Sequence, residues 1–155
     1  LFFGKRPLSN VLRPRFLTPE QYLLLRNEIR PLLRAFDKIS RAAVENEEIR
    51  DQFDLLDWEK ELIQHDPGYS YHTPLTRLDA FYIPNTGELK FTEYNAEVPA
   101  ASAYNDVLNE VFYGLPVMGQ FLRHYAVRPL PTRHSVLHVL LDSYRQWGGT
   151  GRPNR

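Results

Sequence analysis

The chain has 155 residues, of which 43% are hydrophobic, and its 19 basic and 19 acidic residues give a formal net charge of zero. This composition can form the core of one medium-sized domain or of part of a larger protein, and it provides no bulk charge that would attract nucleic acid or an anionic membrane. Cysteine is absent, which excludes disulfides, thiolate metal sites and cysteine nucleophiles and fits a reducing compartment. No apolar run reaches the length of about 18 residues that a membrane-spanning helix needs. We therefore expect a cytoplasmic protein with no nucleic-acid or membrane partner.

Residues 1–17 are rich in proline and arginine and predict an extended arm. Basic and aromatic side chains interleave along it, at Lys5, Arg6, Arg13 and Arg15 and at Phe2, Phe3 and Phe16. Interleaving of this kind suits nucleic acid, but without net charge we favour an arm that docks on a domain outside this chain. The chain starts at Leu1 rather than Met and ends in a glycine-rich, loop-like run. We therefore expect a fragment, with a single α+β domain over residues 18–147 and a linker over 148–155.

The first helix is predicted to begin after Thr18. Thr18-Pro19-Glu20-Gln21 supplies a capping residue, a proline at the first helical position and a glutamine three residues after the cap. Apolar residues follow at helical spacing as far as Phe36, and Pro31 is expected to kink or restart the helix. A second helix is predicted over about residues 47–64, and Asp66-Pro67-Gly68 is predicted to form the turn that ends it.

Two strand-like runs joined by Pro84-Asn85-Thr86-Gly87 predict a β-hairpin. Its outer ends carry Arg77-Leu78-Asp79 and Glu93-Tyr94-Asn95. A three-residue loop with glycine in the left-handed position pairs Pro84 with Glu88, and counting outward sets Asp79 opposite Glu93 and Arg77 opposite Asn95. Because alternate residues of a strand share a face, these four side chains are expected on one face, within about 5–8 Å of their neighbours.

The same register places Phe81, Ile83, Leu89 and Phe91 on that face, as an apolar surface that must be covered. Charged groups on a face that becomes buried are costly unless they are paired or bind a metal. Two carboxylates, an amide oxygen and a guanidinium in one place suit a divalent cation and an anionic phosphate. The alternative is a set of exposed cross-strand pairs without a function.

A nuclease-like pair of an acid and a lysine, Glu88-Leu89-Lys90, also follows Asp79. The predicted register puts Glu88 and Lys90 on the face opposite Asp79, which argues against a metal shared between them.

Helices are predicted again over about residues 102–112 and 116–125, and a last helix is predicted between Thr132 as its cap and Gly148 as its stop. The whole pattern predicts an α+β fold that is helix-rich with a central β-hairpin. Glu97, in the segment that leads from the second strand to the next helix, could join a metal site or bind an amine, or could belong to an ordinary strand-to-helix turn.

The stretch from Arg77 to Pro99 places Arg-x-Asp on one strand and Glu-x-Asn, followed soon by proline, on the next. This arrangement resembles the circularly permuted ATP-grasp ligases, the family of glutathionylspermidine synthase. The resemblance implies that the chain is part of a larger ATP-grasp architecture and that Asp79, Glu93 and Asn95 are ligands of Mg²⁺ ions on the ATP phosphates. It implies that Arg77 is the catalytic cation at the transferring phosphate. The reaction implied is ATP-dependent joining of a carboxylate to an amine through an acyl-phosphate.

Within the family, the lysines and the loop that grip ATP come later in the chain, so the ATP-binding residues cannot be named here. The resemblance implies Mg²⁺ and ATP as cofactors, a small carboxylate and an amine as substrates, and the remaining domains of the parent protein as partners. The fragment alone is expected neither to turn over nor to bind ATP tightly. The competing hypothesis is a non-catalytic helical scaffold or protein-interaction domain whose charged hairpin is structural.

Overall fold

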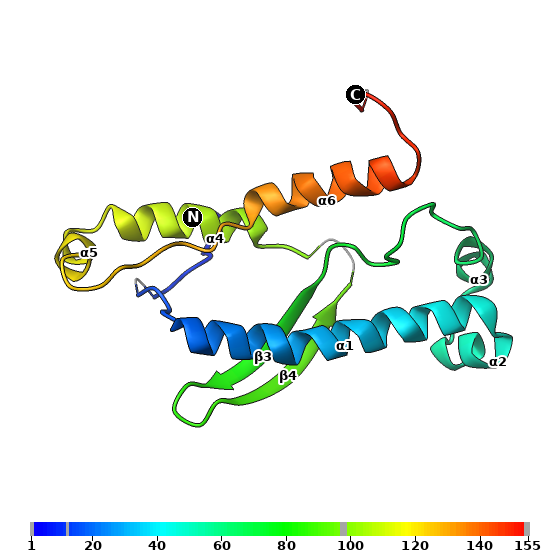
Figure 1. Cartoon of the computed structure of the whole chain (residues 1–155), viewed down its shortest axis with the longest axis horizontal. Coiled ribbons are helices and arrows are strands. Elements are labelled where there is room, and N and C mark those ends of the chain that lie inside the picture. The colour runs from blue at the N-terminus through cyan, green and yellow to red at the C-terminus, as the bar shows by residue number, and fades with distance from the viewer. Residues whose placement is uncertain (1, 12, 97–98, 154–155) are drawn as a thin grey trace. The chain divides into compact units, whose positions relative to one another are not determined.

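The computed structural model describes residues 2–11, 13–96 and 99–153 of the chain. It combines helices with a two-stranded antiparallel hairpin, which confirms the α+β class that the sequence predicts (Figure 1). In chain order the elements are β1 (Phe2–Phe3), β2 (Arg6–Pro7), α1 (Pro19–Glu45), α2 (Glu47–Arg50), η1 (Asp51–Phe53), α3 (Asp57–Leu62), β3 (Arg77–Ile83), β4 (Glu88–Asn95), α4 (Ser102–Tyr113), α5 (Pro116–Phe121) and α6 (Arg133–Gln146).

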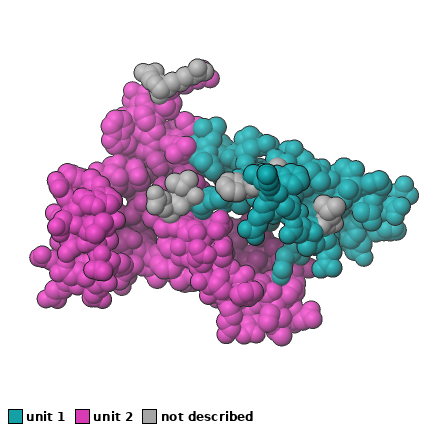
Figure 2. Space-filling model, turned by 180° about the vertical axis from the view of Figure 1, so that it is seen from behind, with its two compact units in different colours: residues 1–16, 99–138 teal, residues 17–98, 139–155 magenta. Residues whose placement is uncertain are grey.

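The chain forms two compact units (Figure 2). Unit 1 comprises residues 1–16 and 99–138, and unit 2 comprises residues 17–98 and 139–155, so the division falls within α6. These units group residues that lie close together in space. They do not test the predicted division into an arm (1–17), a domain (18–147) and a linker (148–155), which stays a prediction. Of the helices that the structure describes, none combines the length and the apolar character needed to cross a membrane.

Helix α1 begins where the sequence predicts, because Thr18 and Gln21 cap each other. The Thr18 hydroxyl accepts a hydrogen bond from the Gln21 backbone N–H (3.2 Å), and the Gln21 side chain accepts one from the Thr18 N–H (3.0 Å). The helix then runs through Pro31 to Glu45 as one element, so the predicted restart at Pro31 does not occur. It ends at Asn46, whose side chain starts α2 by accepting hydrogen bonds from the next turn's N–H groups.

The single helix predicted over residues 47–64 is wrong, because the structure divides this stretch into α2, η1 and α3. The helical path is broken at Asp54, whose backbone is left-handed (φ 50°), a conformation that aspartate adopts more readily than most residues. A new start follows at Leu56, whose N–H donates to the Glu59 side chain (2.8 Å). The predicted turn after α3 is confirmed, since the Gly68 N–H donates to Asp66 Oδ1 (2.8 Å).

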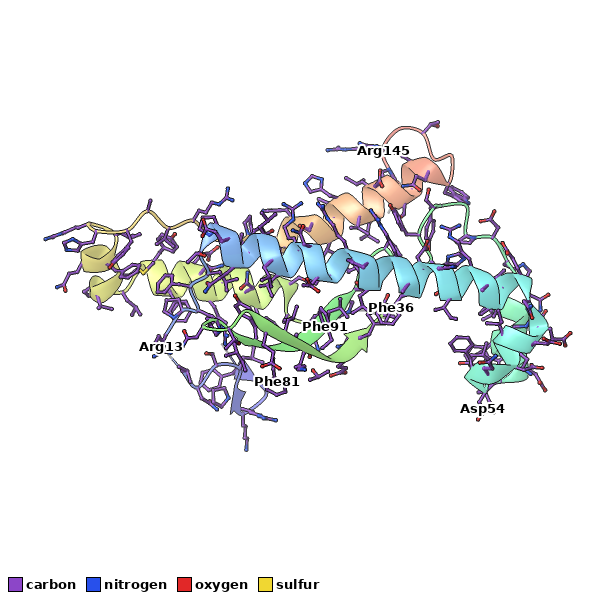
Figure 3. All side chains as sticks on the ribbon, turned by 60° about the horizontal axis from the view of Figure 1, so that its bottom comes forward. Arg13, Phe36, Asp54, Phe81, Phe91 and Arg145 are labelled. Carbon is purple, nitrogen blue, oxygen red and sulfur yellow. The ribbon has the colours of Figure 1, made fainter. Side chains whose placement is uncertain are left out.

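In unit 2, α1 packs against one face of the hairpin formed by β3 and β4. The ring of Phe36 stacks on that of Tyr94, with centroids 4.1 Å apart. Leu24, nearer the start of α1, lies beside the hairpin turn. A Cβ added to Gly87 would lie 3.5 Å from the Leu24 side chain. Figure 3 shows Phe36 and Phe91 where α1 meets the hairpin, with Phe81 on the other side. We call the side toward α1 the inner face and the other side the outer face.

In unit 1, a carboxylate from α4 holds the start of α6. Buried Asp106 accepts hydrogen bonds from the backbone N–H groups of Thr132 (2.9 Å) and Arg133 (3.0 Å). The Thr132 hydroxyl, which the sequence predicts as the cap, donates to the carbonyl of Ser102 (2.6 Å). The helix therefore begins where predicted, but Asp106 supplies the cap.

The end of the predicted arm also packs within unit 1. The ring of Phe16 stacks on Phe121 at the end of α5, with centroids 4.7 Å apart, and Phe121 stacks on Tyr125 at 4.5 Å. Phe16 thus docks on this chain, whereas the sequence predicts docking of the arm on a domain outside it. The helix predicted over 116–125 is shorter than expected and ends at Phe121.

Candidate functional site

The hairpin confirms the residue pairs predicted at its outer end. Strands β3 and β4 are antiparallel, Arg77 lies opposite Asn95, and Asp79 lies opposite Glu93. Near the turn the prediction is wrong by one residue, because Ile83 rather than Pro84 pairs with Glu88. The loop therefore spans four residues, 84–87, and the N–H groups of Thr86 and Gly87 close it by donating to the Ile83 carbonyl (3.3 and 2.9 Å).

A β-bulge at Thr92 restores the predicted pairing. Ala80 pairs with Phe91 and Asp79 with Glu93, so Thr92 is the extra residue on its strand. The Thr92 hydroxyl donates to the carbonyl of Asp79 (3.1 Å). Without the bulge, the four-residue loop would set Asp79 opposite Thr92 and turn Glu93 to the inner face.

The bulge also changes which residues accompany the predicted site. The outer face carries Arg77, Asp79, Phe81, Ile83, Glu88, Lys90, Glu93 and Asn95, and the inner face carries Leu78, Ala80, Tyr82, Leu89, Phe91 and Tyr94. Leu89 and Phe91 therefore do not continue the charged face, contrary to the prediction. Phe81 does share that face but is 73% exposed, so the expected covered apolar surface is not present in the described chain.

Glu88 and Lys90 lie on the Asp79 face, which corrects the prediction that they face away from it. Glu88 is opposite Ile83, four residues along β3 from Asp79, which corresponds to about 13 Å. Two carboxylates that share one cation both lie within about 2.6 Å of it, so this separation is too large. Glu88 is instead paired with Lys90 (3.2 Å). Distance, rather than the choice of face, argues against the nuclease interpretation.

All four predicted residues meet in one hydrogen-bonded cluster, which we call the hairpin network: Arg77, Asp79, Glu93 and Asn95. Arg77 grips Asp79 with two bonds, Nε to Oδ1 (2.8 Å) and Nη2 to Oδ2 (3.3 Å). With the Asn95 amide turned to match its neighbours, its nitrogen donates to Glu93 Oε1 (3.0 Å) and its oxygen accepts from Arg77 Nη2 (3.3 Å). Arg77 and Asn95 therefore link the two carboxylates.

The hairpin network has one more negative than positive charge. The hydrogen bond to Asp79 raises the pKa of the Arg77 guanidinium, and the charges of Asp79 and Glu93 raise that pKa further. The side chains of Arg77 and Asp79 are 38% and 40% exposed, so water screens their attraction. The network is thus an accessible cluster with a net negative charge.

The donor set fits Mg²⁺ in chemical type, since carboxylate and amide oxygens are the ligands this ion prefers. Asp79 and Glu93 supply the carboxylates, and Asn95 would have to supply the third protein oxygen, because no group of three His, Cys, Asp or Glu able to hold a metal occurs in the described part of the chain. Both Asp79 oxygens are bonded to Arg77. An ionised carboxylate has about four lone-pair sites, so Asp79 retains sites for a cation while Arg77 is bound to it. Glu97, the further candidate ligand, lies outside the described residues.

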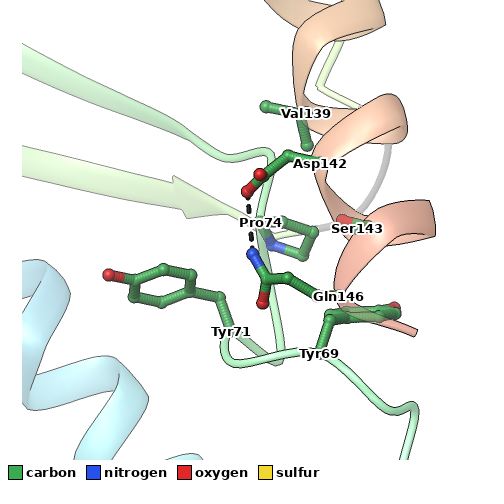
Figure 4. Close-up of a pocket in the computed structure, with 7 residues that line it drawn as sticks. All are labelled: Tyr69, Tyr71, Pro74, Val139, Asp142, Ser143 and Gln146. Carbon is green, nitrogen blue, oxygen red and sulfur yellow. Dashed lines mark hydrogen bonds between the residues drawn. The ribbon is translucent and has the colours of Figure 1, made fainter. Parts of the chain in front are cut away.

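Unit 2 also contains two hollows that the sequence analysis does not predict. The smaller, of about 180 Å³, lies between the loop around Tyr71 and the C-terminal half of α6 (Figure 4). Its Gln146 is already engaged, donating to Asp142 (2.7 Å) and accepting from the Ser70 N–H (2.8 Å). The larger hollow, of about 400 Å³, is lined by Arg30 and Arg34 of α1. Their four-residue spacing, which puts them on one face of a predicted helix, is the sequence signal that could have indicated it.

Comparison of the chain with protein-family models, with curated proteins and with solved structures found no match.

Proposed function

We propose that this chain carries the magnesium-binding hairpin of an ATP-dependent carboxylate–amine ligase, as part of a longer ATP-grasp enzyme. The observation that carries the proposal is the convergence of Arg77, Asp79, Glu93 and Asn95 on the outer face of one hairpin. Their residue types are those that the resemblance to the permuted ATP-grasp ligases assigns to metal and phosphate binding. With the four-residue loop and Thr92 both in the chain, the bulge at Thr92 keeps Asp79 opposite Glu93.

In the proposed reaction a carboxylate becomes an acyl-phosphate, and an amine then displaces the phosphate. The hairpin network has two parts in it. Asp79, Glu93 and Asn95 would hold Mg²⁺, which when bound supplies positive charge beside the ATP phosphates. Arg77 offers a planar pair of N–H donors that matches two phosphate oxygens. Positioning and charge neutralisation of this kind are the main contributions of a protein to phosphoryl transfer.

The pairing of Arg77 with Asp79 fits an exchange of partners. The guanidinium binds a carboxylate in the same two-pronged manner in which it would bind a phosphate. A phosphate that takes over Arg77 would free both oxygens of Asp79, which are the oxygens the cation needs.

The degree of burial supports the view that the chain functions with further protein. Of the apolar residues that the structure describes, Ala43 in unit 2 and Phe112 and Met118 in unit 1 are the buried ones. Domains of this length normally bury a much larger core. We propose that remaining domains of the parent protein cover part of this surface and supply the groups that grip ATP, and that the fragment is inactive alone.

The test is conversion of ATP to ADP by the full-length protein with Mg²⁺ and a pool of carboxylates, amines and amino acids. We expect turnover that depends on Mg²⁺ and on substrates, and a loss of at least about 100-fold in Glu93→Gln. The matched control is Glu88→Gln, which removes a carboxylate from the same face outside the network and should keep activity within about twofold. Absence of turnover, or equal loss in both variants, would contradict the proposal.

The alternative function is a non-catalytic scaffold or protein-interaction domain. It is favoured by the hydrogen bonds within the hairpin network, in which Arg77 binds Asp79 through two bonds and Asn95 bridges Arg77 to Glu93. Under this alternative the full-length protein would not turn over ATP, and Glu93→Gln would change stability alone.

A further inference from the structure

The larger hollow of unit 2 lies between one face of α1 and the segment that leads into β3. We call it the arginine cleft and define it by Arg30, Leu33, Arg34, Tyr71, Thr73 and Tyr94. Its volume of about 400 Å³ falls within the range of pockets that hold small organic molecules. Tyr94 belongs to the inner face of the hairpin, whereas the hairpin network lies on the outer face. The cleft and the proposed metal site therefore lie on opposite faces of the hairpin.

Two guanidinium groups of this cleft have no partner among the residues that the structure describes. Arg30 and Arg34 are one helical turn apart, and within the described ranges neither makes a hydrogen bond or an ion pair. Asp37, the acidic residue that also lines the cleft, is bound by Arg41 (3.0 and 3.4 Å) and lies 3.8 Å from His72. The carboxylate that lines the cleft is therefore already engaged, and two positive charges remain for a ligand.

The opposite wall of the arginine cleft is aromatic, and contacts within unit 2 hold its Tyr94 ring and the loop that carries Tyr71. The Tyr94 ring is stacked on Phe36, and its hydroxyl shares a hydrogen bond with the Thr73 hydroxyl (2.9 Å). The loop that carries Tyr71 and Thr73 is attached at Ser70, whose carbonyl accepts from Arg41 and whose N–H donates to Gln146. A ligand would meet a wall that is already in place, which lowers the cost of binding.

We propose that the arginine cleft binds a small organic anion, with a carboxylate or phosphate group held by Arg30 and Arg34 and a flat apolar part against Tyr71 and Tyr94. Arginine matches both oxyanions through paired N–H donors and is less strongly hydrated than lysine. Aromatic rings beside the charged pair favour an anion with an aromatic or other flat body over inorganic ions. The inference stands independently of the ligase proposal.

The test is titration of the 155-residue chain with phenyl phosphate, benzoate and the neutral analogue benzyl alcohol, followed by NMR of the arginine Nε–H and loop backbone signals. The variant is Arg30→Gln with Arg34→Gln. The control is Arg26→Gln with Lys38→Gln, which removes two positive charges from α1 outside the cleft. Glutamine has nearly the same helix propensity as arginine and lysine, and circular dichroism verifies that both double variants remain folded.

We expect saturable binding of at least one of the two anions, at least tenfold tighter than that of benzyl alcohol. The Arg30/Arg34 variant should weaken it by tenfold or more, while the control stays within about threefold; the ratio between phenyl phosphate and benzoate then identifies the preferred oxyanion. The proposal is overturned if neither anion binds saturably, if the neutral analogue binds equally well, or if the control loses as much affinity as the cleft variant.

Discussion

Ala101 is a residue whose backbone conformation is unfavourable for its side chain. It precedes α4 with φ 86° and ψ −7°, a left-handed conformation that costs a non-glycine residue about 1–2 kcal/mol. We predict that Ala101→Gly raises the free energy of unfolding by about 0.5–1 kcal/mol. Glycine relieves the backbone strain, and this gain exceeds the extra conformational entropy that a glycine loses on folding. Urea unfolding monitored by circular dichroism measures the change.

The neighbouring alanine provides the control for this substitution. Ala100 is not among the residues with positive φ, so Ala100→Gly should bring only the entropic penalty and lower stability slightly. If Ala101→Gly lowers stability as much as Ala100→Gly, the strain assigned to Ala101 is not present in solution.

Asp106 gives a prediction about pH. Its hydrogen bonds from the backbone N–H of Thr132 and then of Arg133 lower the pKa of its carboxyl from the ordinary value of 3.8, although burial opposes this shift. The pKa is lower in the folded than in the unfolded chain, so the stabilisation is complete above about pH 4 and is lost as pH falls through the folded pKa. Asp106→Asn should lower the melting temperature by several degrees at neutral pH.

The difference between wild type and Asp106→Asn isolates this group from the other acids. Asp37 and Glu20 also have lowered pKa values, through Arg41 for Asp37 and through a backbone hydrogen bond for Glu20, but both remain in the variant. The difference in melting temperature should therefore shrink as pH falls below 4. A difference that stays constant across this range would show that Asp106 does not act as an ionised cap.

Residues that act through local contacts were predictable, and residues that act across the fold were not. Thr18 and Gln21 are three apart, so their capping contact follows from sequence. Asp106 caps a helix that begins 27 residues later, and no local pattern indicates such a contact. Arg30 and Arg34 belong to a cleft only because the segment before β3 returns to α1.

At the scale of elements, the hairpin pairing was predicted correctly with two errors that cancel. Three- and four-residue loops are both common in hairpins, so Pro84-Asn85-Thr86-Gly87 does not distinguish them. The four-residue loop shifts the register by one, and the bulge at Thr92 shifts it back. The predicted pairing of Asp79 with Glu93 is confirmed. The faces predicted for Leu89, Phe91, Glu88 and Lys90 are wrong.

Deleting Thr92 tests the role assigned to the bulge. Removal of the extra residue should give a regular ladder that still pairs Ala80 with Phe91 and Asp79 with Glu93. We predict a loss of stability of about 1 kcal/mol or less, mainly from the lost hydrogen bond of the Thr92 hydroxyl to Asp79. Nuclear Overhauser contacts between Asp79 and Glu93 should persist in the deletion variant. Their replacement by contacts in another register would contradict the assignment.

At the scale of the whole molecule, the 155-residue chain is expected to lack ATP-grasp function by itself. The groups that grip the nucleotide are proposed to come from the rest of the parent protein, and the hairpin network would contact only its phosphate end. Calorimetric titration of the chain with ATP and Mg²⁺ should show no binding in the sub-micromolar range, and incubation should release no ADP. Sub-micromolar affinity would show that this chain holds a complete nucleotide site.

The most direct measurement on the central claim is titration of the ¹⁵N-labelled chain with Mn²⁺, a paramagnetic substitute for Mg²⁺ that broadens signals of nearby residues. The account predicts that amide signals of Arg77, Asp79, Glu93 and Asn95 broaden first, that excess Mg²⁺ restores them, and that Glu93→Gln abolishes the effect while Glu88→Gln retains it. Broadening that is spread over the acidic residues of the chain, or that is unchanged in Glu93→Gln, would contradict the assignment of the hairpin network as a metal site.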